Sequence, residues 1–177
     1  MTMKLIVVTS DMKWHSNTEN MVKKANKKLW VLRRLKYLGA EETDLVDVYI
    51  KQIRSVLELA APAWHGAITK EEVINIERIQ KSAAHIILGE DYFSYRVALK
   101  FLKLETLQSR RDKLCLNFAK KAEKHPKFEK WFKTAGGKPN TRQETFKYCD
   151  VKAKHTRLEI SPISFLTKVL NEYHNRK

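Results

Sequence analysis

The sequence predicts a mainly α-helical protein: a helical bundle of about five helices, with one short N-terminal strand and a loosely structured C-terminal tail. Apolar residues recur at intervals of three and four along most of the chain, which is the spacing of one helix face. Capping residues and glycines stand at the ends of these periodic segments. The chain has 177 residues and is 43% hydrophobic, so it can bury a core in one domain or two small subdomains.

The N-terminal segment combines the predicted strand with the first helix. Leu5 to Val8 is short and β-branched, and a Thr-Ser-Asp turn follows it, so residues 5–8 are predicted to form the strand. Ser16 and Glu19 have capping-box spacing, and Gly39 is a typical residue just past a helix end. The first helix is therefore predicted to begin at Ser16, with Val22, Ala25, Leu29, Leu32 and Lys36 on one face.

Two further helices follow in the first half of the chain. Residues 42–60 are predicted to form the second helix, which Pro62 ends, with Leu45, Tyr49, Ile53, Val56, Leu57 and Ala60 on one side. Thr69 and Glu72 form another capping-box pattern, and Gly89 follows the last periodic residue. The third helix is thus predicted to end at Leu88, with an inner face of Ile76, Ile79, Ala83, Ile86 and Ile87.

The second half of the chain contains shorter helices and a linker. Residues 94–102 fit a fourth helix, and Thr106 is the predicted N-cap of a fifth, which turns Leu107, Leu114, Phe118 and Ala122 inward. Residues 136–140 read Gly-Gly-Lys-Pro-Asn, which is typical of a linker. A short docking helix is predicted after it, with Pro162 at its first position.

The net charge of +15 and the isoelectric point near 9.8 favour an anionic partner. Nucleic acid is the first expectation, ahead of an anionic membrane or an acidic protein. No run of 18 apolar residues is present, so we expect no membrane span. Cys115 and Cys149 are too few for a disulfide scaffold and too far apart for a metal knuckle, which favours an intracellular, reducing compartment, either nucleus or cytoplasm.

The residue patterns that enzymes use are missing from the sequence. The acidic pairs Glu41-Glu42 and Glu71-Glu72 lie in first turns of predicted helices, where they complement the helix dipole. The six histidines are scattered, and Cys115 lies beside an apolar helix face, as inert buried thiols do. We therefore expect no catalytic residue, no metal, no cofactor and no small-molecule substrate.

Two basic helix faces are the positive signal for function. On the first helix, one stripe is formed by Lys23, Lys27, Trp30 and Arg34. On the fifth helix, a second group lies away from Phe118 and consists of Arg110, Lys113, Lys120 and Lys124. Cations beside an indole can hold phosphates while the ring stacks on a base or sugar. The alternative is that Trp30 packs on a neighbouring helix and the lysines form an ordinary solvated surface.

Two segments can be interpreted as structural. Arg111 falls within the apolar arc of the fifth helix, where an arginine needs a carboxylate or several carbonyls as partners, so it is predicted to be structural. The triplet Trp64-His65-Gly66 follows the second helix and is either a chemical site or a plug at a chain turn.

Five segments in collinear order resemble the C-terminal part of reverse transcriptases from non-LTR retrotransposons of the jockey type. They are residues 10–39, 49–69, 76–89, 104–121 and 161–171. The family pattern of a helix followed by a Pro-x-Trp-His turn is matched at Arg54, Leu57, Glu58, Ala60, Pro62, Trp64 and His65. In that family this region is the helical thumb and a C-terminal extension, which implies that its helices clasp a template–primer duplex and that Trp64 is a plug.

The resemblance also implies a division of the chain. Residues 1–14 correspond to a remnant strand and turn, 15–89 to a thumb-like three-helix bundle, 90–133 to helices of the extension and 134–177 to a flexible basic tail with a docking helix. The family's palm, with its paired catalytic aspartates, has no counterpart here, and the strand at Lys4 to Val8 lacks the family's glycine. The expected function is non-specific nucleic-acid binding by a polymerase fragment without catalysis. The alternatives are a helical protein-interaction module and a mobile-element relic without function.

Overall fold

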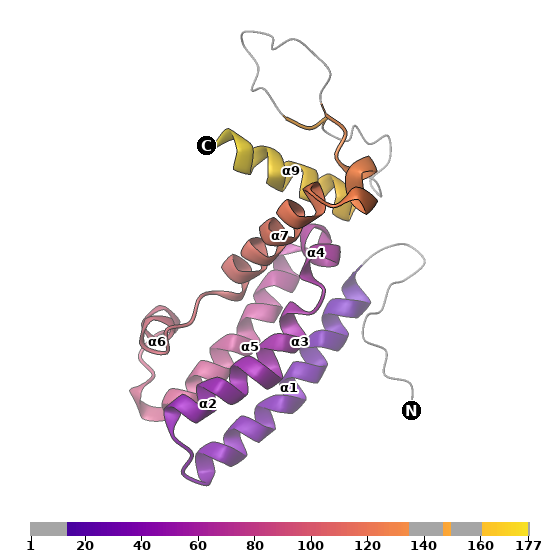
Figure 1. Cartoon of the computed structure of the whole chain (residues 1–177). Coiled ribbons are helices and arrows are strands. Elements are labelled where there is room, and N and C mark those ends of the chain that lie inside the picture. Colours follow the sequence, from indigo (N-terminus) through magenta and orange to yellow (C-terminus); the bar gives the residue numbers. More distant parts are fainter. Residues whose placement is uncertain (1–13, 135–146, 150–160, 177) are drawn as a thin grey trace. The chain divides into compact units, whose positions relative to one another are not determined.

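The computed structural model describes residues 14–134, 147–149 and 161–176, and these are mainly helical (Figure 1). The predicted strand at residues 5–8 and the predicted linker at 136–140 lie outside this part of the chain. Two compact units are present. Unit 1 comprises residues 1–59 and 68–110, and unit 2 comprises residues 60–67 and 111–177. The four ranges implied by the family resemblance have different bounds and remain predictions.

In unit 1, the long helices α1 (His15–Tyr37) and α5 (Lys70–Leu88) pack against each other. The segment between them contains α2 (Glu42–Val48), a π-helical stretch (Tyr49–Arg54) and α3 (Ser55–Glu58), and it also packs on α1. A 3₁₀ turn (Gly89–Asp91) and α6 (Tyr95–Phe101) follow, and α6 packs against α5. The three-helix core predicted for this part of the chain is therefore present within unit 1 (Figure 1).

The start of α1 differs from the prediction. Ser16 lies inside the helix, which begins after Trp14, and no side chain caps it. Trp14 is only 8% exposed, and its carbonyl accepts a hydrogen bond of 3.0 Å from Thr18 Oγ1. Burial of Trp14 thus places the helix start before Ser16, so the predicted Ser16–Glu19 capping box is wrong. Glu19 pairs with Lys23 instead, at 2.6 Å.

The end of α1 confirms its prediction. Gly39 has φ of +82°, in the left-handed region that glycine adopts without strain. Its N–H donates to the Lys36 carbonyl at 3.0 Å, and the Ala40 N–H donates to the Leu35 carbonyl at 3.1 Å. This pair of bonds is the Schellman arrangement, which satisfies carbonyls that the helix end leaves open.

The second predicted helix contains a π-helical stretch that its sequence pattern did not indicate. Its fully buried residues are spaced by four: Leu45, Tyr49, Ile53 and Leu57. In an α-helix of 3.6 residues per turn, such a spacing drifts by about 40° at each step. The wider π turn, with its i→i+5 bonds, reduces this drift and keeps the row facing the core.

The segment around Pro62 corrects another prediction. The helix ends at Glu58, and Ala60 adopts a left-handed conformation with φ of 50°. Pro62 lies in the first turn of a new short helix, α4 (Ala61–Trp64), where a proline needs no N–H donor. The prediction that Pro62 ends a helix reaching Ala60 is therefore wrong. The helix stops before the left-handed residue Ala60, and Pro62 belongs to the next helix.

Helices α5 and α6 begin and end as predicted. Thr69 Oγ1 accepts from the Glu72 N–H at 3.2 Å, and Glu72 Oε2 accepts from the Thr69 N–H at 2.7 Å, so this capping box is confirmed. Gly89 follows the end of α5, and the hydroxyl of Ser94 caps α6 by accepting the Val97 N–H. These local signals agree with the tertiary structure, so the boundaries were readable from sequence.

A buried polar network ties α5 to its neighbours in unit 1. The Tyr49 hydroxyl donates to Gln80 Oε1 at 2.5 Å, and Gln80 Nε2 donates to the Tyr95 hydroxyl at 3.0 Å and to the Glu105 carbonyl at 2.8 Å. The Tyr95 hydroxyl in turn donates to Glu77. Because these hydrogen bonds join α5 to Tyr95 and to the Glu105 carbonyl, the network holds α6 and the chain after it on α5.

Unit 2 is built on the main part of α7 (Leu107–Glu123) and on α9 (Pro162–Asn175). Its core contains Cys115, Ala119, Ala122, Phe132, Tyr148, Leu166 and Leu170. The predicted docking helix with Pro162 at its start is confirmed, and Ser161 caps it. The 3₁₀ segment Pro126–Trp131 and the short bridge between Thr134 and Tyr148 complete the described part of this unit.

Candidate nucleic-acid interface

The predicted stripe on α1 is a solvent-exposed surface. Lys23, Lys27 and Arg34 are all exposed, and the Trp30 side chain is 65% exposed. The opposite side of the helix is committed to the core, since Ala25, Leu29 and Leu32 are almost completely buried. The alternative that Trp30 packs on a neighbouring helix is therefore wrong. We call the exposed residues Lys23, Lys27, Trp30, Arg34 and Tyr37 the α1 stripe.

Tyr37 belongs to this stripe although the sequence analysis did not include it. It lies seven residues after Trp30, which returns it to the same helix face, and its side chain is 80% exposed. The Arg34 guanidinium lies 5.4 Å from the centre of the Tyr37 ring, within the range of a cation–π contact. Continuing the same spacing by one more step would have identified Tyr37.

The cations of α1 differ in how much they are engaged by the protein. Lys23 pairs with Glu19 at 2.6 Å, and this contact lowers the pKa of the exposed Glu19 carboxyl. Lys28, beside the stripe, donates to the Gln52 carbonyl at 2.8 Å. Such exposed ion pairs contribute little to stability and exchange easily for an external phosphate. The α1 stripe can therefore contact an anionic ligand without loss of core interactions.

The predicted basic group on α7 does not form one surface. Arg110, in unit 1, forms a two-pronged ion pair with Glu58, with Nε–Oε1 at 2.5 Å and Nη2–Oε2 at 3.1 Å. The hydrogen bond to Glu58 raises the pKa of Arg110, and its side chain is 29% exposed. Arg110 thus serves the fold of unit 1. Lys113 is exposed on the part of α7 that belongs to unit 2.

The last two residues of the α7 group, Lys120 and Lys124, line a cavity of about 500 Å³ in unit 2. The other residues of its wall are Glu123, Lys147, Tyr148, Tyr173 and His174. The Lys120 ammonium lies 3.7 Å from the centre of the Tyr173 ring. We call this space the unit 2 cavity. Sequence spacing could place Lys120 beside Lys124, but only the fold brings Lys147 and His174 to them.

Glu123 organises one wall of the unit 2 cavity. Its Oε1 accepts hydrogen bonds from Lys147 Nζ at 2.6 Å, from His174 Nε2 at 3.0 Å and from the Tyr148 hydroxyl. Burial alone would raise the pKa of this carboxyl, but the three hydrogen bonds outweigh burial and lower the pKa to about 2. Glu123 is therefore ionised at neutral pH, and its charge is compensated within the protein.

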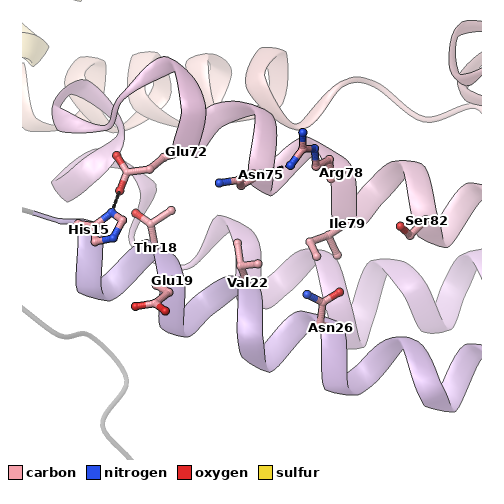
Figure 2. Close-up of a pocket in the computed structure, with 10 residues that line it drawn as sticks. All are labelled: His15, Thr18, Glu19, Val22, Asn26, Glu72, Asn75, Arg78, Ile79 and Ser82. Atoms are coloured by element: carbon pink, nitrogen blue, oxygen red, sulfur yellow. Dashed lines mark hydrogen bonds and ion pairs between the residues drawn. The ribbon is translucent and has the colours of Figure 1, made fainter.

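Unit 1 contains a smaller cavity of about 290 Å³ between α1 and α5 (Figure 2). Two pairs of its polar side chains contact each other. His15 Nδ1 lies 3.3 Å from Glu72 Oε1, and Arg78 Nη1 donates to Asn75 Oδ1 at 3.1 Å. Glu72 also completes the capping box of α5, so this carboxylate already serves the start of that helix.

The Trp64-His65-Gly66 triplet is a packing element of unit 2. The Trp64 side chain is completely buried, which confirms that it is a plug. A Cβ atom added at Gly66 would lie 2.3 Å from Cγ of Phe165, so only glycine allows α9 to approach this closely. Together Trp64 and Gly66 fix the short α4 segment against α9.

His65 and Arg111 form the polar side of this packing. Arg111 Nε donates to His65 Nδ1 at 3.3 Å, and His65 Nε2 pairs with Asp112 Oδ1 at 2.7 Å. Burial lowers the pKa of His65, and the Arg111 charge adds to this effect while Asp112 opposes it. A neutral imidazole can accept from Arg111 and donate to Asp112. Arg111 is completely buried, which agrees with the structural role predicted for it, and His65 is one of its partners.

The described residues also bear on thiol reactivity, metal binding and membrane spanning. Burial raises the pKa of the Cys115 thiol to about 12, so this sulfur stays protonated at neutral pH. Among residues 14–134, 147–149 and 161–176, no cluster of histidine, cysteine and acidic side chains is arranged to hold a metal ion. No helix in this same part of the chain is long and apolar enough to cross a membrane.

Comparisons with known proteins found no family model, no curated protein and no solved structure that matches the chain.

Proposed function

We propose that this protein binds nucleic-acid duplexes through the α1 stripe, without sequence specificity and without catalysis. One observation supports this proposal most directly. Two strongly exposed aromatic rings, Trp30 at 65% and Tyr37 at 80%, lie among exposed cations on the side of α1 that the core does not use. Exposed aromatic rings among cations suit a sugar–phosphate backbone, because the rings can stack on sugars or bases while the cations contact phosphates.

The proposed contacts explain why binding should be non-specific. Lys23, Lys27 and Arg34 would neutralise phosphates, which carry no base sequence. Trp30 and Tyr37 would cover sugars or exposed bases at a duplex end or a frayed strand. The resemblance to the thumb of jockey-type reverse transcriptases supports the same role, because the corresponding region of that family clasps a template–primer duplex. In this thumb-like role the chain would hold the duplex and would not itself catalyse polymerisation.

A salt titration of duplex binding tests the proposal. With one phosphate neutralised by each of the three stripe cations, log affinity plotted against log salt should have a slope of about −2.7 on a DNA duplex. The double variant Lys23→Glu/Lys27→Glu should weaken binding to all sequences alike and flatten the slope. Lys70→Glu/Lys81→Glu, which makes the same charge change on exposed positions of α5, is the matched control. Equal effects of the two variants would show that only bulk charge matters.

The absence of catalysis in the proposal is tested separately. Purified protein supplied with template, primer, nucleotides and Mg²⁺ or Mn²⁺ should not extend the primer, since polymerisation requires carboxylates that converge on a metal pair. Extension that a single Asp or Glu substitution abolishes would overturn this part of the proposal.

A protein-interaction module is the second candidate, and α6 favours it. Phe93, Val97 and Phe101 are spaced by four and are 85%, 51% and 64% exposed. Arg96 and Lys100 are exposed beside them, so a partner should combine apolar and acidic side chains. Fluorescence anisotropy with an acidic amphipathic peptide tests this candidate. Phe93→Ser/Phe101→Ser should abolish peptide binding and leave duplex affinity unchanged, and binding that survives the double substitution would eliminate α6 as the site.

A further inference from the structure

The unit 2 cavity has a surplus of positive charge. Three lysines and one carboxylate line it, which gives a net charge of +2 with His174 neutral. The cavity lies at the C-terminal end of α7, where the helix dipole contributes about −0.5 charge. The surplus of about +1.5 that remains after the helix dipole is subtracted suits an anion rather than a neutral ligand.

The contacts in the cavity show where this surplus is located. Lys147 is engaged by Glu123 at 2.6 Å, and the same carboxylate oxygen accepts hydrogen bonds from His174 and Tyr148. The carboxylate and Lys147 therefore largely compensate each other. The surplus charge therefore lies on Lys120, in the last turn of α7, and on Lys124, which directly follows the helix end at Glu123.

We propose that the unit 2 cavity binds a phosphate monoester dianion, held mainly by Lys120 and Lys124. A phosphate monoester carries about −1.5 to −2 charges at pH 7, which matches the surplus of the cavity. A backbone phosphodiester carries a single charge and matches it less well. The Lys147 ammonium also lines the cavity and has further N–H donors besides the one that Glu123 accepts. This site is independent of the α1 stripe and of the duplex binding proposed for it.

The monoester can come from two sources, a free phosphate compound or the phosphorylated end of a nucleic-acid strand. Calorimetric titrations at low ionic strength with inorganic phosphate and with dimethyl phosphate, a diester, compare the two anion types. A short oligonucleotide with and without a 5′-phosphate tests the second source. We expect inorganic phosphate to bind at least tenfold more tightly than dimethyl phosphate and to shift the NMR signals of the His174 ring. A higher affinity of the phosphorylated oligonucleotide would identify a strand end as the source, whereas equal oligonucleotide affinities would leave free phosphate compounds as the ligands.

Two variants with the same loss of charge distinguish phosphate binding in the cavity from phosphate attraction by the overall positive charge of the chain. Lys120→Gln/Lys124→Gln removes the two central cations. Lys121→Gln/Lys130→Gln removes two exposed lysines of unit 2 that do not line the cavity. The first variant should weaken phosphate binding about tenfold or more, and the second less than twofold. Equal weakening by both variants, or no preference for the monoester over the diester, would overturn the proposal. Both variants leave the α1 stripe intact, so the loss of phosphate binding should not be accompanied by loss of the duplex binding proposed for that stripe.

Discussion

Helices α1 and α7 carry basic residues at similar spacings, yet their cations occupy different environments. On α1, the predicted cations remain on one exposed face together with Trp30 and Tyr37. On α7, Arg110 is held by Glu58, and Lys120 lies over the Tyr173 ring. Helical periodicity thus places side chains on one side of a helix, but tertiary neighbours decide which of them remain available to a partner.

The difference follows from the partners that each helix meets. One side of α1 packs on α5 and on the segment from α2 to α3, while the residues of the α1 stripe are exposed. Helix α7 spans both compact units, so Arg110 contacts unit 1 and the residues after it belong to unit 2. Carboxylates and aromatic rings from distant segments then reach its cations. A basic stripe is therefore a stronger predictor of a binding surface on a helix that buries a single face.

Of the substitutions considered, Trp64→Ala should cause the largest loss of stability, whereas Trp30→Ala should cause almost none. Trp64 is completely buried, so its truncation should lower the free energy of unfolding by about 3–5 kcal/mol. Trp30 is 65% exposed, so its truncation should change that free energy by less than about 0.5 kcal/mol and weaken duplex binding. Chemical denaturation and duplex titration measure the two effects. A stable Trp64→Ala protein that has lost duplex binding would reverse the roles of the two tryptophans.

The two tryptophans also show what could be predicted from sequence. Their spacing placed Trp30 on a basic face and Trp64 at a turn after a helix, and both positions agree with the structure. Signals confined to one turn, such as Thr69 with Glu72 and the glycine after α1, predicted helix ends correctly. Such local signals succeed because the hydrogen bonds involved join residues only a few positions apart.

The failures concern contacts between distant residues. Ser16 has the chemistry of a cap, but burial of Trp14 shifted the helix start beyond it. The unit 2 cavity joins Lys120 on α7 to Lys147 and His174, which no periodicity relates. Sequence reasoning therefore predicted the α1 stripe nearly completely, but it predicted two of the three cavity lysines only as part of a surface group. The buried face of α7 is likewise rotated by one residue, from Leu114 and Phe118 to Cys115 and Ala119.

Acidification should destabilise unit 2 through Glu123, while the α1 stripe has no equivalent buried carboxylate contact. The pKa of this carboxyl is lowered from 4.5 to about 2 in the folded protein. Its contribution to stability is then fully present above pH of about 4.5 and is lost as the pH falls through that value toward 2. The integrated effect is about 2–3 kcal/mol. Denaturant unfolding between pH 7 and pH 2 measures it.

Glu123→Gln is the control for this acid effect, because the amide cannot titrate. In this variant the pH dependence between 4.5 and about 2 should shrink. His65 acts at higher pH, since burial lowers its pKa below 6.5 and its contribution is lost as the pH falls below that ordinary value. An unchanged acid profile in Glu123→Gln would mean that other carboxylates cause the loss of stability.

Arg110→Gln should have an intermediate effect, on stability alone. Arg110 forms two charge-assisted hydrogen bonds to Glu58, whose side chain is only 13% exposed. Arg54 lies 3.7 Å from the same carboxylate and partly compensates for the loss, so the cost should be about 1–2 kcal/mol. Duplex affinity should be unchanged within twofold. A variant that keeps its stability but loses duplex binding would restore Arg110 to the interface predicted from sequence.

The smallest effect separates two adjacent lysines of α1. Lys27 is exposed within the α1 stripe, whereas Lys28 donates to the Gln52 carbonyl at 2.8 Å. Lys27→Gln removes one proposed phosphate contact, so the slope of log affinity against log salt should fall by about 0.9 for a DNA duplex. Its stability should change by less than about 0.5 kcal/mol, as for most surface substitutions.

Lys28→Gln has the same change in net charge and should give the opposite pattern. The slope should stay as in the unaltered protein, and loss of the bond to Gln52 should cost about 0.5–1.5 kcal/mol. Salt titrations of both variants on one duplex, together with denaturant unfolding, complete the comparison. If both substitutions lowered the slope equally, the duplex would respond to the total charge of α1 and not to the face on which a cation lies. The distinction between exposed and engaged cations would then fail at its most direct test, since these adjacent residues carry the same charge but differ in helix face and in what their ammonium groups contact.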